Sequence, residues 1–178
     1  MTKRDNYVFT GLQIVAWIIF VGLSIEAGAL VFNFIFSLFK PEAVKNLYQK
    51  LDLSQIYNLN IWVYFGVYSF ILTVSILKAY LFYVVIKLLS KLDLSKPFSS
   101  FASLHITNIS YIALSVGLIS YIARQTVRGL PHYGFDIAAL DSFWIDSKAY
   151  ILMAAVLYVI ASIFKRGVEL QNENDLTV

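Results

Sequence analysis

Four long runs of apolar residues, joined by short polar connectors, dominate the chain. They cover Val8–Phe39, about Ile61–Leu89, about Phe98–Val127 and about Phe143–Phe164. A helix needs roughly 20 residues to cross a hydrocarbon core of about 30 Å, and each run is longer than that. None of the runs alternates between apolar and polar positions as a membrane strand does. The pattern therefore predicts four transmembrane helices.

The connectors indicate where these helices begin and end. In the segment from Pro41 to Tyr57, apolar residues recur at near-helical spacing, with basic and amide side chains between them. This spacing predicts a short amphipathic helix on the membrane surface. Pro97 suits the first turn of the third helix, and Ser95 is its candidate N-cap. The apolar positions of the first connector are Val44, Leu47, Tyr48, Leu51 and Ile56.

The predicted fold is all-α: an integral membrane bundle of four transmembrane helices, with the short surface helix between the first and the second. We expect a single transmembrane domain over residues 1–178, with a polar C-terminal tail at 165–178. The first apolar run is far longer than the 7–15-residue core of a signal peptide. We therefore expect it to be retained as a membrane helix.

Composition supports the membrane interpretation and narrows the chemistry. Hydrophobic residues make up 59% of the chain and charged residues 14%, with a mean hydropathy of +0.71. A soluble domain of this size has too much surface to hide so much apolar area. The chain has no cysteine and two distant histidines, so we expect no disulfide, no metal site and no cofactor.

The basic residues indicate contact with lipid and a weak preference for one orientation. The net charge is +3, but most basic residues lie at helix ends, where head groups rather than nucleic acid are the expected partner. With the N-terminus inside, the inner side has a small excess of Lys and Arg over the outer side. This favours N- and C-termini in the cytoplasm. The inner set is Lys3, Arg4, Lys87, Lys91, Lys96, Lys165 and Arg166, against Lys40, Lys45, Lys50, Arg124, Arg128 and Lys148.

Two charged residues, Glu26 and Lys78, lie near the middle of the first and second apolar runs. A charge at that depth costs roughly 2.5–3.5 kcal/mol on insertion scales, so such residues usually face the bundle interior and have a partner. Small and polar residues at helical spacing accompany them, which predicts an intramembrane polar cluster. The other members of this cluster are Asn33, Tyr68, Ser75, His105 and Asn108.

This cluster has two competing interpretations. In the first, Glu26 and Lys78 form a structural ion pair and the other residues make interhelical hydrogen bonds. In the second, Glu26, Lys78, Tyr68 and Asn33 form a small-ligand or proton-sensitive site. His105 is either a satisfied hydrogen-bonding group or a ligand. No catalytic motif is visible, neither a Ser-His-Asp set nor HExxH nor a phosphate-binding loop, so we do not expect an enzyme.

Three segments resemble a known family. They are FVGLSIEAG in the first run, KLDLSKPFSSFASLHITNIS leading into the third, and the ending IFKRGVELQNENDLTV. With them the whole chain resembles domain-of-unknown-function family 2975, a group of small bacterial four-helix membrane proteins. The resemblance implies the bacterial inner membrane and a cytoplasmic helix-turn-helix regulator as partner. The tail is the natural contact for that partner, at Glu169, Leu170, Glu173, Asp175, Leu176, Thr177 and Val178.

Three functions remain open at this point. The first is a non-enzymatic inner-membrane protein that acts as a sensor or as the partner of such a regulator. The second is a small oligomeric transporter or an immunity-type membrane protein that uses the region of Glu26 and Lys78. The third is an accessory subunit of a larger membrane complex. In each case membrane lipids are expected partners and direct binding of nucleic acid is not.

Overall fold

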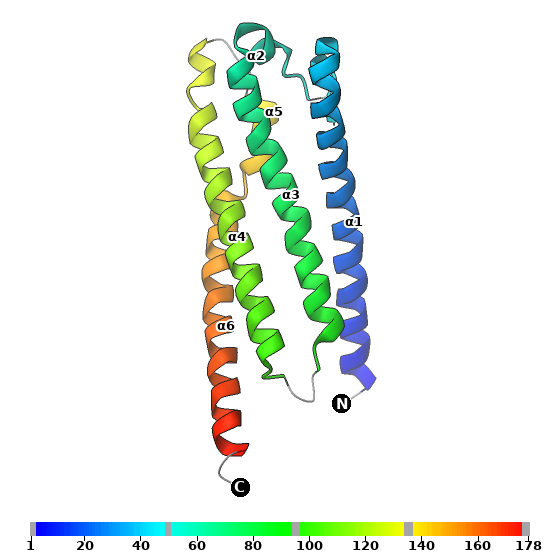
Figure 1. The fold of residues 1–178 in the computed structure, drawn as a ribbon, viewed down its shortest axis with the longest axis vertical. Coiled ribbons are helices and arrows are strands. Elements are labelled where there is room, and N and C mark those ends of the chain that lie inside the picture. The colour runs from blue at the N-terminus through cyan, green and yellow to red at the C-terminus, as the bar shows by residue number, and fades with distance from the viewer. Residues whose placement is uncertain (1–2, 49–50, 94–96, 134–136, 176–178) are drawn as a thin grey trace.

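The computed structural model describes residues 3–48, 51–93, 97–133 and 137–175, and the described residues form helices and connecting turns without a strand (Figure 1). Four of the helices are long and apolar enough to cross a membrane. The predicted all-α membrane bundle, with a short helix between its first two long helices, is therefore confirmed. The elements are α1 (Lys3–Phe39), η1 (Pro41–Lys45), α2 (Ser54–Leu59), α3 (Ile61–Lys91), α4 (Ser100–Val127), η3 (Leu130–Tyr133), α5 (Ala138–Trp144) and α6 (Ser147–Asp175).

The four long helices lie in a row, in the order α1, α3, α4 and α6 (Figure 1). α4 packs most extensively on α6, α1 packs on α3, and α3 joins the two pairs through α4. The outer helices are therefore mostly exposed. Only 17% of the apolar span of α1 or of α6 is buried within the protein, against 44% for α4. Both outer helices therefore present wide apolar faces, which suit contact with lipid.

The two ends of the bundle differ in construction. α1 begins and α6 ends at the same end, which we call the terminal end (Figure 1). At the opposite end, which we call the loop end, α2 and the turns on either side of it close the molecule. An even number of antiparallel long helices produces this arrangement.

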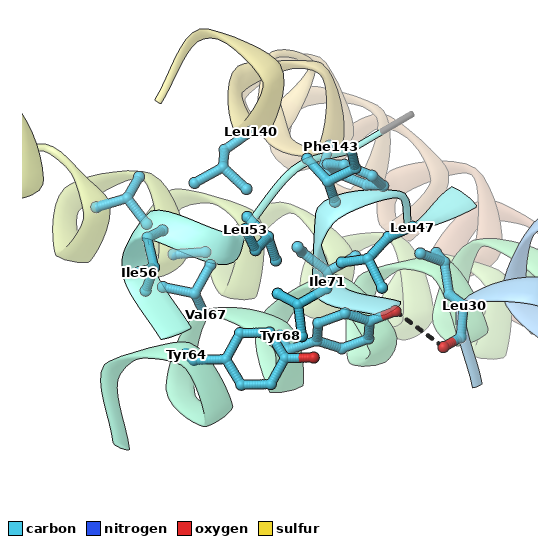
Figure 2. Close-up of a cluster of buried hydrophobic side chains, with 14 of the residues drawn as sticks. Leu30, Leu47, Leu53, Ile56, Tyr64, Val67, Tyr68, Ile71, Leu140 and Phe143 are labelled. Carbon is cyan, nitrogen blue, oxygen red and sulfur yellow. Dashed lines mark hydrogen bonds between the residues drawn. The ribbon is translucent and has the colours of Figure 1, made fainter. Parts of the chain in front are cut away.

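The segment between α1 and α3 is part of the core at the loop end. Its apolar residues pack against α3 and α5, as Figure 2 shows. Two backbone hydrogen bonds fold the segment back on itself, from Leu53 N to Val44 O at 3.1 Å and from Leu47 N to Leu51 O at 3.0 Å. The predicted short helix is confirmed as α2, although most of the apolar positions face the bundle instead of a membrane surface. The buried residues of the segment are Val44, Leu47, Leu51, Leu53 and Ile56.

Two side chains define where α3 and α4 begin. Asn60 accepts hydrogen bonds from the backbone N–H groups of Trp62 and Val63, at 2.9 and 3.3 Å. Ser99 accepts one from the N–H of Ala102 at 3.2 Å. Both satisfy donors that a helix start leaves unpaired. Ser99 is thus the N-cap of α4, and the earlier candidate, Ser95, lies outside the described residues.

Small residues at heptad spacing hold α4 against α6. Ser103 Oγ donates to the carbonyl oxygen of Ala161 at 3.4 Å, and Ser110 Oγ donates to that of Ala154 at 2.9 Å. One heptad further on, Gly117 lies so close to α6 that an added Cβ would be 2.6 Å from Ile151 Cγ1. Small side chains allow two backbones to approach closely in an apolar medium, where packing and interhelical hydrogen bonds drive association.

The described part of the predicted polar tail at 165–178 is helical. α6 continues through Asp175 instead of ending near Phe164. Its polar end contains several residues with good helix propensity, including Lys165, Arg166 and Glu169, which favour continuation of the helix beyond the apolar run. We call residues 165–175 the C-terminal extension. Leu176, Thr177 and Val178, which were predicted to contact a partner, lie outside the described residues.

Candidate functional site

Lys78 lies near the middle of α3 and is directed toward α5 and α6. Its Nζ donates a hydrogen bond to the carbonyl oxygen of Phe143 at 3.3 Å and lies 5.9 Å from the centre of the Tyr150 ring. Phe143 is in the last turn of α5, where carbonyl groups lack helix partners and the helix dipole is negative. Lys78 therefore caps the C-terminus of α5.

Glu26 is not brought to Lys78. Glu26 is partly buried on α1, which packs on α3, whereas the ammonium group of Lys78 reaches α5. In the part of the chain that the structure describes, ion pairs within 4.0 Å join Arg124 to Asp141 and Arg166 to Glu169. The structural ion pair between Glu26 and Lys78, one of the two interpretations of the sequence, is therefore not formed.

Tyr68, another member of the predicted cluster, fastens α3 to α1. Its hydroxyl is buried and donates to the carbonyl oxygen of Leu30 at 3.0 Å, the dashed line in Figure 2. One turn earlier, the Tyr64 hydroxyl lies 2.8 Å from Ser37 Oγ. Because Ser37 donates its own proton to Phe34 O at 2.7 Å, it accepts the proton of Tyr64. These hydroxyls are engaged in packing two helices together.

The remaining predicted residues are distributed over α1, α3 and α4. Ser75 is buried in α3, and Asn33 is partly buried on α1. His105 is buried on α4 and its Nδ1 donates to the carbonyl oxygen of Phe101 at 2.9 Å, because a carbonyl can only accept. Its ring centre lies 3.9 Å from that of Phe101. His105 is therefore a satisfied structural histidine, whereas Asn108 is exposed on the same helix.

Asn108 lies in a groove between α4 and α6, near the terminal end. We call this the α4–α6 groove; it has a volume of about 550 Å³ and is open to the surroundings of the bundle. Two charged residues of the C-terminal extension, Lys165 and Glu169, also line the groove. A residue of the predicted polar cluster, Asn108, and one of the predicted partner contact, Glu169, thus line the same groove. The groove is otherwise lined by Ser100, Ser103, Leu104, Thr107, Tyr111, Tyr158, Ala161, Ser162 and Val168.

The C-terminal extension is fixed by an aromatic contact from the connector before α4. The ring of Phe98 lies over Gly167, where an added Cβ would meet ring atoms at 2.5–2.9 Å, and 5.3 Å from the ring centre of Phe164. Only a glycine leaves room for this approach. The α3–α4 connector and the start of the extension are thereby joined mechanically.

Charges on the extension are arranged along one helix turn. Arg166 Nη1 donates to Glu169 Oε2 at 2.8 Å, and this contact raises the pKa of the guanidinium above its usual value. Both side chains are largely exposed, so the pair adds little to stability. Beyond it, Leu170 is 52% exposed among polar neighbours. An exposed leucine on a polar helix suits contact with another molecule.

The loop end has its own polar contacts, which the sequence analysis did not pick out. Arg124 at the end of α4 lies 3.8 Å from Asp141 of α5. Hydrogen bonds from Ser54 lower the pKa of the Asp52 carboxyl, and Ser54 N donates to Asp52 Oδ1 at 2.8 Å. A lowered pKa means that this contact supports the start of α2 above about pH 4 and is lost as the pH falls below that value.

The sequence analysis did not identify two features that form the groove. The first is the heptad of small residues, Ser103, Ser110 and Gly117, which sets the distance between α4 and α6; its spacing of seven is readable in the sequence. The second is Lys165, which was counted only as a topology signal. No group of histidine, aspartate and glutamate side chains that could hold a metal ion occurs in the residues that the structure describes.

Taken together, the fold and its polar contacts define a multi-pass helical membrane protein whose intramembrane polar groups mostly serve packing. A family profile described as "Protein of unknown function (DUF2975)" matches residues 15–178. The chain therefore belongs to this family, as the resemblance had indicated. Neither a curated protein nor a solved structure matches the chain.

Proposed function

We propose that this protein is a non-enzymatic protein of the bacterial inner membrane that binds a cytoplasmic helix-turn-helix regulator through its C-terminal extension. The observation that carries the proposal is the continuation of α6 through Asp175, beyond its apolar stretch. Because α6 remains helical where it emerges from the membrane, it presents its side chains at fixed spacing. Partner proteins recognise helices by such spacing.

The side chains of the extension support this role. Leu170 is exposed between Glu169 and Gln171, so it offers an apolar anchor with a polar rim. The contact of Phe98 with Gly167 joins the extension to the α3–α4 connector. A change in the packing of the long helices would therefore reach the surface that the regulator binds. In this proposal the bundle is the sensor and the extension is the output.

The test is co-purification of the regulator from native membranes that contain the tagged full chain. Deleting residues 169–178 is expected to abolish recovery of the regulator, and Leu170→Ser to lower it about tenfold or more, as loss of an anchor residue does. The matched control is Gln55→Ala, which changes an exposed side chain at the loop end. Unchanged recovery with the deletion would overturn the proposal.

A second function, an accessory subunit of a larger complex, is supported by a different observation. A Cβ added at Gly11, Gly22 or Gly28 of α1 would meet no atom of another helix within 4 Å. These glycines serve no packing inside one chain, yet they would let the helix of another subunit approach closely. Gly22→Leu is expected to release a membrane partner from the purified complex while the chain stays folded. Recovery of the wild-type protein as a monomer without a membrane partner would remove this candidate.

The transporter alternative receives no such support. That alternative relied on a shared site around Glu26 and Lys78. The structure does not pair these two residues, and Lys78 donates a hydrogen bond to Phe143 O instead.

A further inference from the structure

The α4–α6 groove differs from the rest of the lipid-facing surface in its chemistry. Exposed positions of α1 and α6 are mostly large apolar side chains. The groove instead gathers hydroxyl, amide and charged groups on two adjacent helices. An uncompensated polar group facing hydrocarbon costs free energy, so a concentration of such groups calls for a polar partner.

The polarity of the groove is graded along the helix axis. At one end the rings of Tyr111 and Tyr158 lie 6.3 Å apart, within the apolar stretches of α4 and α6. At the other end Lys165 and Glu169 follow Phe164, the last residue of the apolar run. From Tyr158 to Glu169 the helix rises by about 16 Å at 1.5 Å per residue. The groove thus runs from the hydrocarbon region to the head-group region of one leaflet.

The polar groups of the groove are not equally available. The hydroxyls of Thr107 and Ser162 donate to carbonyl groups of their own helices, at 2.8 and 2.9 Å. The amide of Asn108 is exposed in the groove three residues before Tyr111, toward the hydrocarbon end. Asn108 therefore offers donors and an acceptor to the ester groups of a lipid whose head group lies at the charged mouth.

The charges at the mouth of the groove are complementary to a phosphodiester and a hydrogen-bond donor. Lys165 takes part in neither of the ion pairs found in the described residues. Glu169 receives a hydrogen bond from Arg166 on Oε2, which leaves Oε1 as an acceptor. The two residues are four apart, so their side chains share one face of α6. The mouth thus presents a cation beside an acceptor.

We propose that the α4–α6 groove binds one glycerophospholipid whose head group carries hydrogen-bond donors, as ethanolamine and glycerol head groups do. Lys165 binds the phosphate, Glu169 accepts from the head-group ammonium or hydroxyl, and Asn108 bonds the ester region. One acyl chain lies along Leu104 and the tyrosine pair. Glu169 belongs to both surfaces, but lipid binding needs neither Leu170 nor residues 171–178, so Leu170→Ser separates binding of the regulator from binding of the lipid.

The first test is native mass spectrometry of the full chain in detergent, titrated with lipids of identical acyl chains. Phosphatidylethanolamine and phosphatidylglycerol are expected to fill one site more tightly than phosphatidylcholine, whose trimethylammonium group donates no hydrogen bond. Equal affinity for all three lipids, or several equivalent sites, would overturn the proposal.

Variants separate the groove from general lipid contact. Lys165→Gln is expected to weaken binding of all three lipids by about tenfold or more, because a charge-assisted hydrogen bond is lost. Glu169→Gln should leave phosphatidylcholine unaffected and abolish the preference for the other two. The control is Arg128→Gln, an exposed cation near the end of α4 away from the groove. If Lys165→Gln and Arg128→Gln have the same effect, the groove is not a site.

A final arm distinguishes a lipid from a soluble phosphorylated ligand. Glycerophosphoethanolamine, which has the head group without acyl chains, is expected not to compete with the lipid at equal concentration. Competition by this compound would show that the groove takes a soluble ligand and would overturn the proposal. Asn108→Leu, which keeps the charges and removes the amide, should weaken lipid binding while the unfolding temperature of the lipid-free protein is retained.

Discussion

At the scale of single residues, the polar side chains in the apolar stretches fall into two groups. Tyr64, Tyr68 and Lys78 bond to oxygen atoms of neighbouring segments, so they fix the positions of α1, α3 and α5. Glu26 and Asn108 are outside this set. The position of a polar or charged residue within an apolar run thus indicates that it needs a partner. Only the structure identifies that partner.

The first prediction concerns the missing contact between Glu26 and Lys78. Lys78→Met is expected to destabilise the protein by about 1–3 kcal/mol, because the carbonyl of Phe143 loses its donor. Glu26→Gln should change stability by less, and the double variant should be additive within about 0.5 kcal/mol. Thermal or denaturant unfolding in detergent measures all three. A coupling of 2 kcal/mol or more, on the order expected for interacting groups, would mean that the two residues interact after all.

The second prediction concerns the closest approach of α4 and α6. Gly117→Ala places a Cβ 2.6 Å from Ile151 Cγ1 and 3.0 Å from two backbone atoms of α6, and backbone cannot move aside cheaply. The expected destabilisation is about 1–3 kcal/mol, as for overpacking of a core. The matched control is Gly66→Ala, because a Cβ there meets nothing and alanine favours the helix. Equal loss of stability in both variants would contradict this account.

At the scale of elements, the long helices could be predicted from the sequence and their partners could not. An apolar run of 20 or more residues specifies a helix regardless of its neighbours, because hydrocarbon leaves backbone groups no other partner. The connector between α1 and α3 shows the limit. Its periodicity predicted one amphipathic helix, but the pattern does not say whether a membrane or a protein core covers the apolar side. Here a protein core covers the apolar side of the connector, and part of that core comes from α5, which is distant in sequence.

The third prediction tests this connector. Leu53 is 2% exposed and packs in the core shown in Figure 2, so Leu53→Ala is expected to cost about 2–5 kcal/mol. Leucine on a membrane surface would lose far less on truncation. Gln55→Ala, two residues away and exposed, is the control and should be neutral. An unfolding temperature for Leu53→Ala that equals the control would return the segment to the membrane surface.

The fourth prediction concerns the extension as an element. Phe98→Ala removes the ring that covers Gly167, so residues 165–175 lose a tertiary contact at the start of the extension. Short isolated helices are marginal in water. Hydrogen exchange measured by mass spectrometry should therefore rise in this stretch and stay unchanged in the core of α4. Leu118→Ala, an exposed change on α4 outside the groove, serves as the comparison.

At the scale of the whole molecule, the two proposals depend on orientation in different ways. The terminal end holds the start of α1 and the C-terminal extension (Figure 1). The mouth of the α4–α6 groove, lined by Lys165 and Glu169 of the extension, is at the same end. A cytoplasmic regulator can reach the extension only if this end faces the cytoplasm. The lipid groove, in contrast, works in either leaflet, because both contain phospholipid.

The absence of cysteine from the sequence makes orientation directly measurable. Gln55→Cys at the loop end and Gln171→Cys on the extension each introduce one exposed thiol. With the terminal end in the cytoplasm, a maleimide that does not cross the inner membrane should label Gln55→Cys in intact cells. It should label Gln171→Cys only after the membrane is permeabilised. The small excess of basic residues at the terminal end predicts this result. The reverse labelling would place the extension outside, which removes a cytoplasmic regulator as its partner and leaves the accessory-subunit role and the phospholipid groove, neither of which depends on orientation.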